Sequence, residues 1–328
     1  MTLFTTIRGK ITPKSVKASG YGFVTGQNMM YSHSISVFRS DGSAVVTIPD
    51  TVDLAALGHP EHSGTFKGAP VEATFTPDGR YEYVSNYAMY GPGFGPEGTD
   101  DCLPSNHIDA SYVYRIDTRT WKVDQAIKVG AVPKYVAMTP DARTLLVTNW
   151  CSATMSIVDT TTAQEVGTVT LGRNPRGIAI TSDSRTAYVA IMGSSIIAKV
   201  DIERRTFSTL WSGGSSPRHL VLSPDNHWLY ATLNGSGVVT KIATATNAVV
   251  ASVRTGSAPR SMDISSDGRS LYVVNYESDT VTKLRTDTMT ALQTIATSHH
   301  PIGITYDPTT GRVWVACYVG VISVFDEK

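Results

Sequence analysis

The sequence predicts an all-β, seven-bladed β-propeller in which each blade holds four antiparallel strands. Three observations support this fold class. A proline-led apolar segment recurs seven times, and short runs rich in β-forming residues follow each copy, separated by turn residues. Units of about 40 residues with four strands each are typical of propeller blades. No segment keeps the 3.6-residue apolar period of an amphipathic helix, so few helices are expected.

The repeats are regular over most of the chain. Five prolines stand 42 residues apart, and two more lie upstream at spacings of 63 and 57 residues. The seven are Pro13, Pro70, Pro133, Pro175, Pro217, Pro259 and Pro301. A typical copy continues with a turn such as TPDGR and three further strand-length runs rich in Val, Ile, Thr and Tyr. Aspartate in these turns is expected to have a local structural role.

The two ends of the chain are expected to share one blade. The seventh unit, residues 300–326, stops after its third strand, whereas residues 2–8 resemble a fourth strand that leads into the next proline. Pairing these segments closes the ring and removes exposed sheet edges. Residues 1–328 are therefore predicted to form one domain, although the length alone would also suit two.

Composition excludes several classes of protein. The chain carries 28 basic and 28 acidic side chains, and this balance argues against a strongly basic nucleic-acid-binding protein. No apolar run reaches the length of a membrane helix, and the first residues lack the pattern of a signal peptide. The chain as given is expected to be soluble, with its localisation left open. Three cysteines are too few for a disulfide scaffold.

The repeat pattern resembles that of the YVTN-repeat β-propellers, the YncE-like group. Matching stretches are TPDGRYEYVSNY, TPDARTLLVTNW and SSDGRSLYVVNY, and the resemblance covers nearly the whole chain. It implies a binding scaffold, exported or periplasmic in some relatives, and some relatives bind DNA. Similar propellers include lactonases and lyases, so function has to be argued from the site.

Two segments interrupt the 42-residue period. About 15 extra residues fall within 49–68, between blades one and two, and about 21 within 88–110, between two strands of blade two. Both insertions are expected on the face where the innermost strands begin, here called the upper face. We expect them to wall a ligand site, with family-specific decoration or an assembly contact as the alternative.

The position after each repeat proline is rich in cations. Around the ring these residues are Lys14, Val71, Lys134, Arg176, Arg218, Arg260 and Ile302. Because they begin the innermost strands, the five cations are expected to converge at the upper mouth of the central channel, where a bound anion would relieve their repulsion. The structural alternative is that they pair with neighbouring carbonyls or with acids such as Glu72 and Glu277.

Aromatic residues at the ends of the second strands are expected at the same mouth. They are Tyr87, Trp150, Tyr276 and Tyr318. With the arginines they could stack a planar ligand or the bases of single-stranded DNA. The neighbouring asparagines either face a ligand or bond to their own turns. The leading hypothesis is a ligand-binding or interaction propeller whose partner is an anionic or planar small molecule or a protein.

The alternative function is an enzyme of the lyase, cyclase or lactonase type, acting on a carboxylated or phosphorylated small molecule. His219 and His300 are the bases expected near the arginines. No cofactor is predicted, although an inventory on the same face permits a transition metal: His107, His219, His299, His300 and Cys317. Cys102 and Cys151 are interpreted as a disulfide, as free thiols or as metal ligands.

Overall fold

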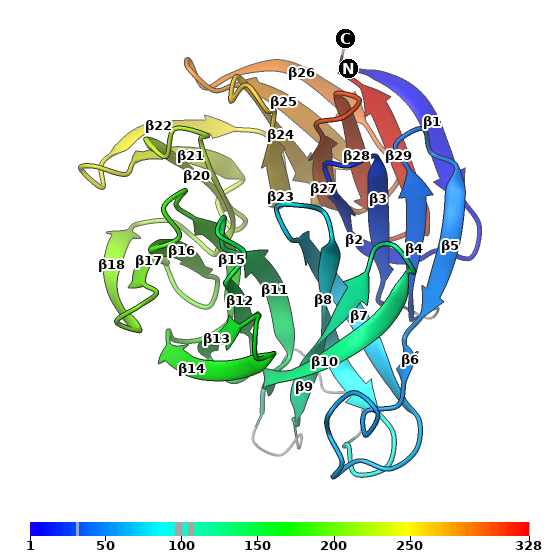
Figure 1. Cartoon of the computed structure of the whole chain (residues 1–328). Helices are drawn as coiled ribbons and strands as arrows, with labels where there is room; N and C mark the ends of the chain where they lie inside the picture. The colour runs from blue at the N-terminus through cyan, green and yellow to red at the C-terminus, as the bar shows by residue number, and fades with distance from the viewer. Residues whose placement is uncertain (31–32, 96–100, 104–107, 328) are drawn as a thin grey trace.

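Seven β-sheets surround a central channel in the computed structural model of the chain, which describes residues 1–30, 33–95, 101–103 and 108–327 (Figure 1). Each sheet has four antiparallel strands, and one of them carries an additional short strand. The predicted all-β, seven-bladed propeller is confirmed. Each repeat of the sequence therefore corresponds to one blade. The repeat proline lies at the channel, and the last strand of each blade lies on the outside.

The blades follow one another along the chain, and within each the strands run from the channel outward. Blade one contains β2 (Pro13–Ala18), β3 (Phe23–Asn28), β4 (Ser34–Arg39) and β5 (Ala44–Pro49). Blade two contains β7 (Phe66–Phe75), β8 (Tyr81–Tyr90), β9 (Ala110–Asp117) and β10 (Lys122–Ala131), with the short β6 (Thr51–Val52) paired to β7. Blade three contains β11 (Pro133–Met138), β12 (Thr144–Asn149), β13 (Thr154–Asp159) and β14 (Gln164–Thr170).

The remaining blades repeat this order. Blade four contains β15 (Pro175–Ile180), β16 (Thr186–Ile191), β17 (Ile196–Asp201) and β18 (Thr206–Ser212). Blade five contains β19 (Pro217–Leu222), β20 (Trp228–Leu233), β21 (Val238–Ala243) and β22 (Val249–Arg254). Blade six contains β23 (Pro259–Ile264), β24 (Ser270–Asn275), β25 (Thr280–Arg285) and β26 (Thr290–Ala296). Blade seven contains β27 (Pro301–Asp307), β28 (Arg312–Cys317), β29 (Val321–Asp326) and β1 (Thr2–Arg8).

The ring closes through β1, as predicted. This strand pairs antiparallel with β29, from Thr2 opposite Asp326 to Arg8 opposite Val321. Figure 1 shows the two ends of the chain side by side at this blade. The outer strand of blade seven therefore comes from the beginning of the sequence, and the last and first blades are held together by backbone hydrogen bonds.

The core lies between adjacent blades. In one cluster Ile157 and Leu146 of blade three pack against Ile178 and Val189 of blade four, and all four side chains are nearly inaccessible to solvent. Equivalent clusters join the other blades, because apolar residues alternate along the strands and point into the spaces between sheets. This packing fixes the spacing of the inner strands and leaves their first residues facing the channel.

The turn aspartates have the structural role expected of them. In each of these turns the carboxylate accepts hydrogen bonds from the hydroxyl two residues before it and from the backbone N–H two residues after it. The pattern recurs at Asp78, Asp141, Asp183, Asp225 and Asp267. These turns lie on the face opposite the repeat prolines, which is called the lower face below.

Among the residues that the structure describes, no helix has both the length and the apolar character to cross a membrane.

Candidate functional site

A cavity of about 420 Å³ lies at the upper mouth of the channel and is called the cationic cavity here. All five predicted cations line it: Lys14, Lys134, Arg176, Arg218 and Arg260. Three predicted aromatic residues, Tyr87, Trp150 and Tyr318, form part of its wall. The structure therefore brings together side chains from blades that are far apart in the sequence.

The inner strands direct these side chains to the cavity through a shared irregularity. In every blade the pairing between the first and second strands shifts just after the repeat proline, for example between Pro133 and Tyr135 and between Pro217 and Leu220. A bulge of this kind re-aims the side chains beside it. Proline suits the first residue of the strand because it has no N–H to donate to the ladder.

The cations are buried more deeply than charged residues usually are. Lys14 and Lys134 are each 4% exposed, and Arg176 and Arg218 are each 5% exposed. Arg176 Nη2 lies 3.5 Å from the Glu72 carboxylate, whereas Lys14 and Arg218 have no ion-pair partner among the described residues. Lys14 Nζ, Arg218 Nε and Arg260 Nε are buried without a hydrogen-bond partner. Within the described part of the chain, no acidic side chain therefore balances the charge of Lys14 or Arg218.

Burial and the positive charge of neighbouring side chains lower the pKa of both Lys14 and Arg218. Burial, reinforced by the positive charge of Arg176 and Arg218, lowers the pKa of Lys14 well below its ordinary value. Burial and the neighbouring Arg176 and Arg260 likewise lower the pKa of Arg218. An anion in the cavity would oppose both effects, because it would stabilise the charged form of each side chain.

The aromatic residues hold the cations in place. Lys134 Nζ lies 4.3 Å from the ring centre of Tyr87 and 5.4 Å from that of Trp150. Tyr276 stacks on Arg260, with its ring centre 3.4 Å from Cζ of the guanidinium, so it orients this arginine from behind. Cation–π contacts of this kind are favourable in desolvated sites.

The methionines of the wall were not singled out from the sequence. Met29, Met30 and Met192 line the cavity beside the aromatic residues. A signal existed, because Met29 and Met192 directly follow the residue that pairs with the repeat proline. In blades two, three and seven the same position holds Tyr87, Trp150 and Tyr318. Their flexible thioethers provide an apolar and adaptable surface.

The repeat asparagines have structural partners. Asn149 Nδ2 donates to Thr154 Oγ1 at 3.1 Å and to Ser156 Oγ at 2.7 Å, and Asn275 bonds to Thr280 and Thr282 in the same way. These amides tie the end of the second strand to the start of the third. Their recurrence therefore follows from the construction of the blade.

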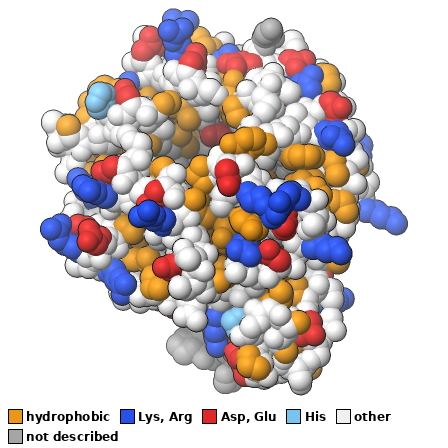
Figure 2. All heavy atoms as spheres, viewed as in Figure 1, with side chains coloured by type: hydrophobic (Ala, Val, Ile, Leu, Met, Phe, Trp, Pro, Cys, Tyr) orange, Lys and Arg blue, Asp and Glu red, His pale blue; other side chains and the backbone are white. Residues whose placement is uncertain are grey.

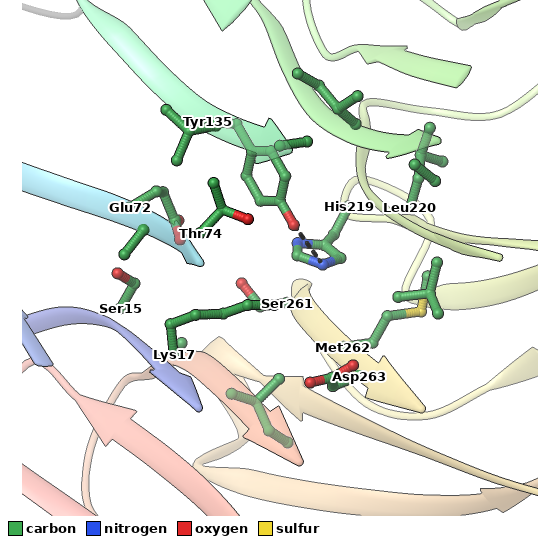
Figure 3. Close-up of a pocket in the computed structure, with 18 of the residues that line it drawn as sticks. Ser15, Lys17, Glu72, Thr74, Tyr135, His219, Leu220, Ser261, Met262 and Asp263 are labelled. Atoms are coloured by element: carbon green, nitrogen blue, oxygen red, sulfur yellow. Dashed lines mark hydrogen bonds between the residues drawn. The ribbon is translucent and has the colours of Figure 1, made fainter. Parts of the chain in front are cut away.

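The two candidate histidines lie in different places. His219 follows Arg218 but faces a second pocket lower in the channel, where its Nε2 is 3.4 Å from Tyr135 Oη (Figure 3). Burial, followed by the positive charge of Arg176, lowers the pKa of His219 to about 3.

His300 lies on the upper face, where its ring stacks on Tyr276 with centroids 4.1 Å apart. His299 stacks on His300, and its Nδ1 lies within hydrogen-bonding distance of Asp279 Oδ2, at 2.8 Å.

The two insertions contact each other at the side of blade two. The His62 ring from the first stacks on Phe94 of the second at 5.0 Å, and Phe66 packs edge-on against Phe94 at 5.7 Å. The residues of these contacts do not line the cationic cavity, whose described lining comes from the blades and their adjoining turns. The expectation that the insertions wall the ligand site therefore stays a prediction.

Of the alternatives for the cysteines, the structure contains the disulfide. Cys102 and Cys151 are joined, with Cα atoms 5.1 Å apart, and the bond ties the second insertion to the turn after β12. Cys317 is a free, buried thiol. Among the described residues no group of three or more His, Cys, Asp or Glu side chains is arranged to hold a metal ion. His107, a metal candidate, lies outside the described residues.

Comparison with known proteins agrees with this architecture. A model of the YNCE-like beta-propeller family matches residues 102–284, more than half of the chain. The chain belongs to this family. Hydrazine synthase from Kuenenia stuttgartiensis is similar to this YNCE-like propeller in structure, with a TM-score of 0.77 and 18% sequence identity. The similarity covers 98% of this chain and 97% of that chain and shows the shared fold alone. A comparison with curated proteins finds no match.

The matched segment of the YNCE-like propeller contains four of the five cations and three whole blades between its ends. The repeat pattern continues on both sides of it, through β2 and Lys14 before it and through β27 after it. The family assignment therefore explains the blades. The chemistry of the cavity has to be inferred from its own residues.

Proposed function

We propose that this YNCE-like propeller is a ligand-binding protein whose cationic cavity takes a compact organic anion with more than one negative charge. The main support is the convergence of five cations, of which Lys14 and Arg218 form no ion pair with any described residue. Guanidinium groups are well suited to carboxylate and phosphate because each can donate two parallel hydrogen bonds. Lys14, Arg218 and Arg260 present unpartnered buried donors that such an anion would satisfy.

The remaining wall favours an organic anion over a bare inorganic ion. Trp150, Tyr318 and the three methionines supply apolar surface next to the cations. A ligand with a charged part near the arginines and a planar or apolar part against this wall would use both. The volume of about 420 Å³ falls in the range of small-molecule pockets.

The first test is calorimetric titration with citrate and pyrophosphate as probes. Arg218→Met should weaken binding by about 10- to 100-fold, because a hydrogen bond to a charged group contributes about 1.5–3 kcal/mol. The unliganded variant should be more stable than the wild type, since a buried, repelled cation has been removed. Opposite effects on affinity and stability distinguish a lost ligand contact from a folding defect.

Arg269→Met is the matched control. Arg269 lies on a turn of the lower face, and its side chain is 85% exposed, so this change should leave affinity unaltered. Equal affinity of wild type and Arg218→Met for both probes would contradict the proposal. Tight binding of a single-stranded oligonucleotide with a steep decrease on adding salt would instead favour DNA as the partner.

The second candidate function is catalysis on an anion held in the same cavity. One observation favours it. The His300 ring stacks on Tyr276, and Tyr276 stacks on Arg260, which lines the cavity. The His300 imidazole is therefore linked to the cavity through these two side chains. A lyase, cyclase or lactonase would use this group as a base. His300→Ala should then abolish turnover while citrate affinity is retained; turnover that is unaffected would remove His300 from the reaction.

A further inference from the structure

A second cavity, of about 280 Å³, lies in the channel below the cationic cavity and is called the lower pocket (Figure 3). Its polar side chains come from two positions of the repeat, two and four residues after the proline. They include Ser15, Lys17, Glu72, Tyr135, His219 and Asp263. Only Glu72 and His219 of this set stand out in the sequence, because the side chains at these two positions, unlike the cations, differ in chemistry from blade to blade.

Two side chains of opposite charge in this pocket have no ion-pair partner in the part of the chain that the structure describes. Lys17 on β2 and Asp263 on β23 both line it, and neither forms an ion pair with any described residue, including each other. Asp263 is nevertheless fixed: its Oδ1 accepts the Ile264 N–H at 2.8 Å, and its Oδ2 accepts the Tyr306 N–H at 2.9 Å. Glu72 differs, because Arg176 already balances its charge.

Apart from Glu72, the other polar side chains of the wall are uncharged, and apolar residues line the rest of it. Tyr135 and His219 meet although blade four lies between their blades, because that blade has Gly177 at the equivalent position. A Cβ on Gly177 would lie 2.8 Å from the Cα of His219. With its lowered pKa, His219 is neutral at physiological pH. The Ser15 and Ser261 hydroxyls donate to the carbonyls of Val71 and Ile302.

We propose that the lower pocket is a second binding site, independent of the cationic cavity, for a small zwitterion such as a free amino acid. The ligand carboxylate would bind the Lys17 ammonium, and the ligand ammonium would bind the Asp263 carboxylate. Each end would neutralise a charge that forms no ion pair with the described residues, so only a ligand with both ends gains both contacts. The neutral Tyr135–His219 pair would add hydrogen bonds without favouring either sign.

The test is calorimetric titration of the full chain with glycine, β-alanine and 4-aminobutyrate, which differ in the separation of their charges. At least one should bind saturably with one site per chain. Acetate and methylammonium, each with one of the two charges, should bind at least about tenfold more weakly, because each makes only one of the charged contacts. Lys17→Met and Asp263→Asn should each weaken binding of the best zwitterion by about tenfold or more.

Two controls keep the result specific. Lys17→Met should retain citrate binding in the cationic cavity, which shows that the channel is still folded. Arg269→Met should bind the zwitterion as the wild type does. The proposal is overturned if no zwitterion binds at concentrations up to about 10 mM. It is also overturned if acetate or methylammonium binds as tightly, or if a folded Lys17→Met variant keeps full affinity.

Discussion

At the scale of single residues, the position after the repeat proline concentrates charge more than any other. Lys14, Lys134, Arg176 and Arg218 come from four blades, yet each is at least 95% buried in one cavity. Their placement could be predicted from the sequence because the repeat is in register and its first residue faces the channel. Chain composition concealed it, since 28 acids elsewhere cancel the total charge.

His219 shows what the repeat pattern could not predict, which is the direction of a side chain beside a bulge. His219 is adjacent to Arg218, and adjacency suggested a shared site. The bulge after Pro217 alters the alternation of side chains, so His219 lines the lower pocket. A sequence pattern gives the repeat position, whereas the direction of a side chain at a bulge depends on backbone geometry.

Glu82 provides a prediction about stability. It is fully buried between blades one and two, where Thr25 and Gln27 donate to its Oε1 while its Oε2 has no partner. Burial raises its pKa from 4.5 to about 8. The unfolded chain loses this proton at lower pH than the folded one, so stability should fall as pH rises from about 4.5 to 8 and stay lowered above that.

Glu82→Gln should remove this pH dependence. Chemical denaturation should find the variant more stable than the wild type at about pH 9, by on the order of a few kcal/mol, with the difference shrinking towards pH 5. Glu203→Gln, at an exposed position, is the control. A Glu82→Gln variant that is no more stable at pH 9 than at pH 5, relative to wild type, would contradict this explanation.

At the scale of elements, strands were predictable and loop packing was not. Each strand has a local signature of β-branched and aromatic residues bounded by turns, and β1 was assigned to the last blade from its similarity to a fourth strand. The insertions have no such signature. Their contact through His62 and Phe94 depends on tertiary packing that no repeat position indicates.

The disulfide gives a prediction for the second insertion. Cys102 and Cys151 are 49 residues apart, and closing a loop of this size restricts the unfolded chain by about 4 kcal/mol in the chain-entropy model. The double variant Cys102→Ser/Cys151→Ser should therefore have a lower Tm. Dithiothreitol should lower the Tm of the wild type and leave that of the double variant unchanged; an equal response of both proteins would show that another group is responsible.

At the scale of the whole molecule, charge is arranged by depth. Figure 2 shows basic and acidic side chains interspersed over the visible face. The channel is different, because cations gather at its upper mouth while the lower pocket holds both signs. Repetition of the blade produces the first arrangement, because residues at one position of the repeat lie at the same level of the channel in every blade. Variation among the blades produces the second.

Coupling between anions and protons follows from this arrangement. Lys14 has its pKa lowered by burial and by the neighbouring cations, and a bound anion would raise it again. Binding should therefore take up protons at a pH between the two values. Titrations with citrate over a range of pH, each in two buffers that differ in ionisation enthalpy, should report net uptake. Lys14→Met should reduce that uptake; unchanged uptake would exclude Lys14 as the coupled group.

The central claim is that the cationic cavity is an anion-binding site, and a crystal structure of the protein with citrate tests it most directly. We predict citrate inside the cavity, with carboxylate oxygens within hydrogen-bonding distance of Arg218 and at least one of Lys14, Arg176 and Arg260. Citrate bound elsewhere on the molecule, with the cavity free of it under conditions that saturate binding in solution, would contradict the account.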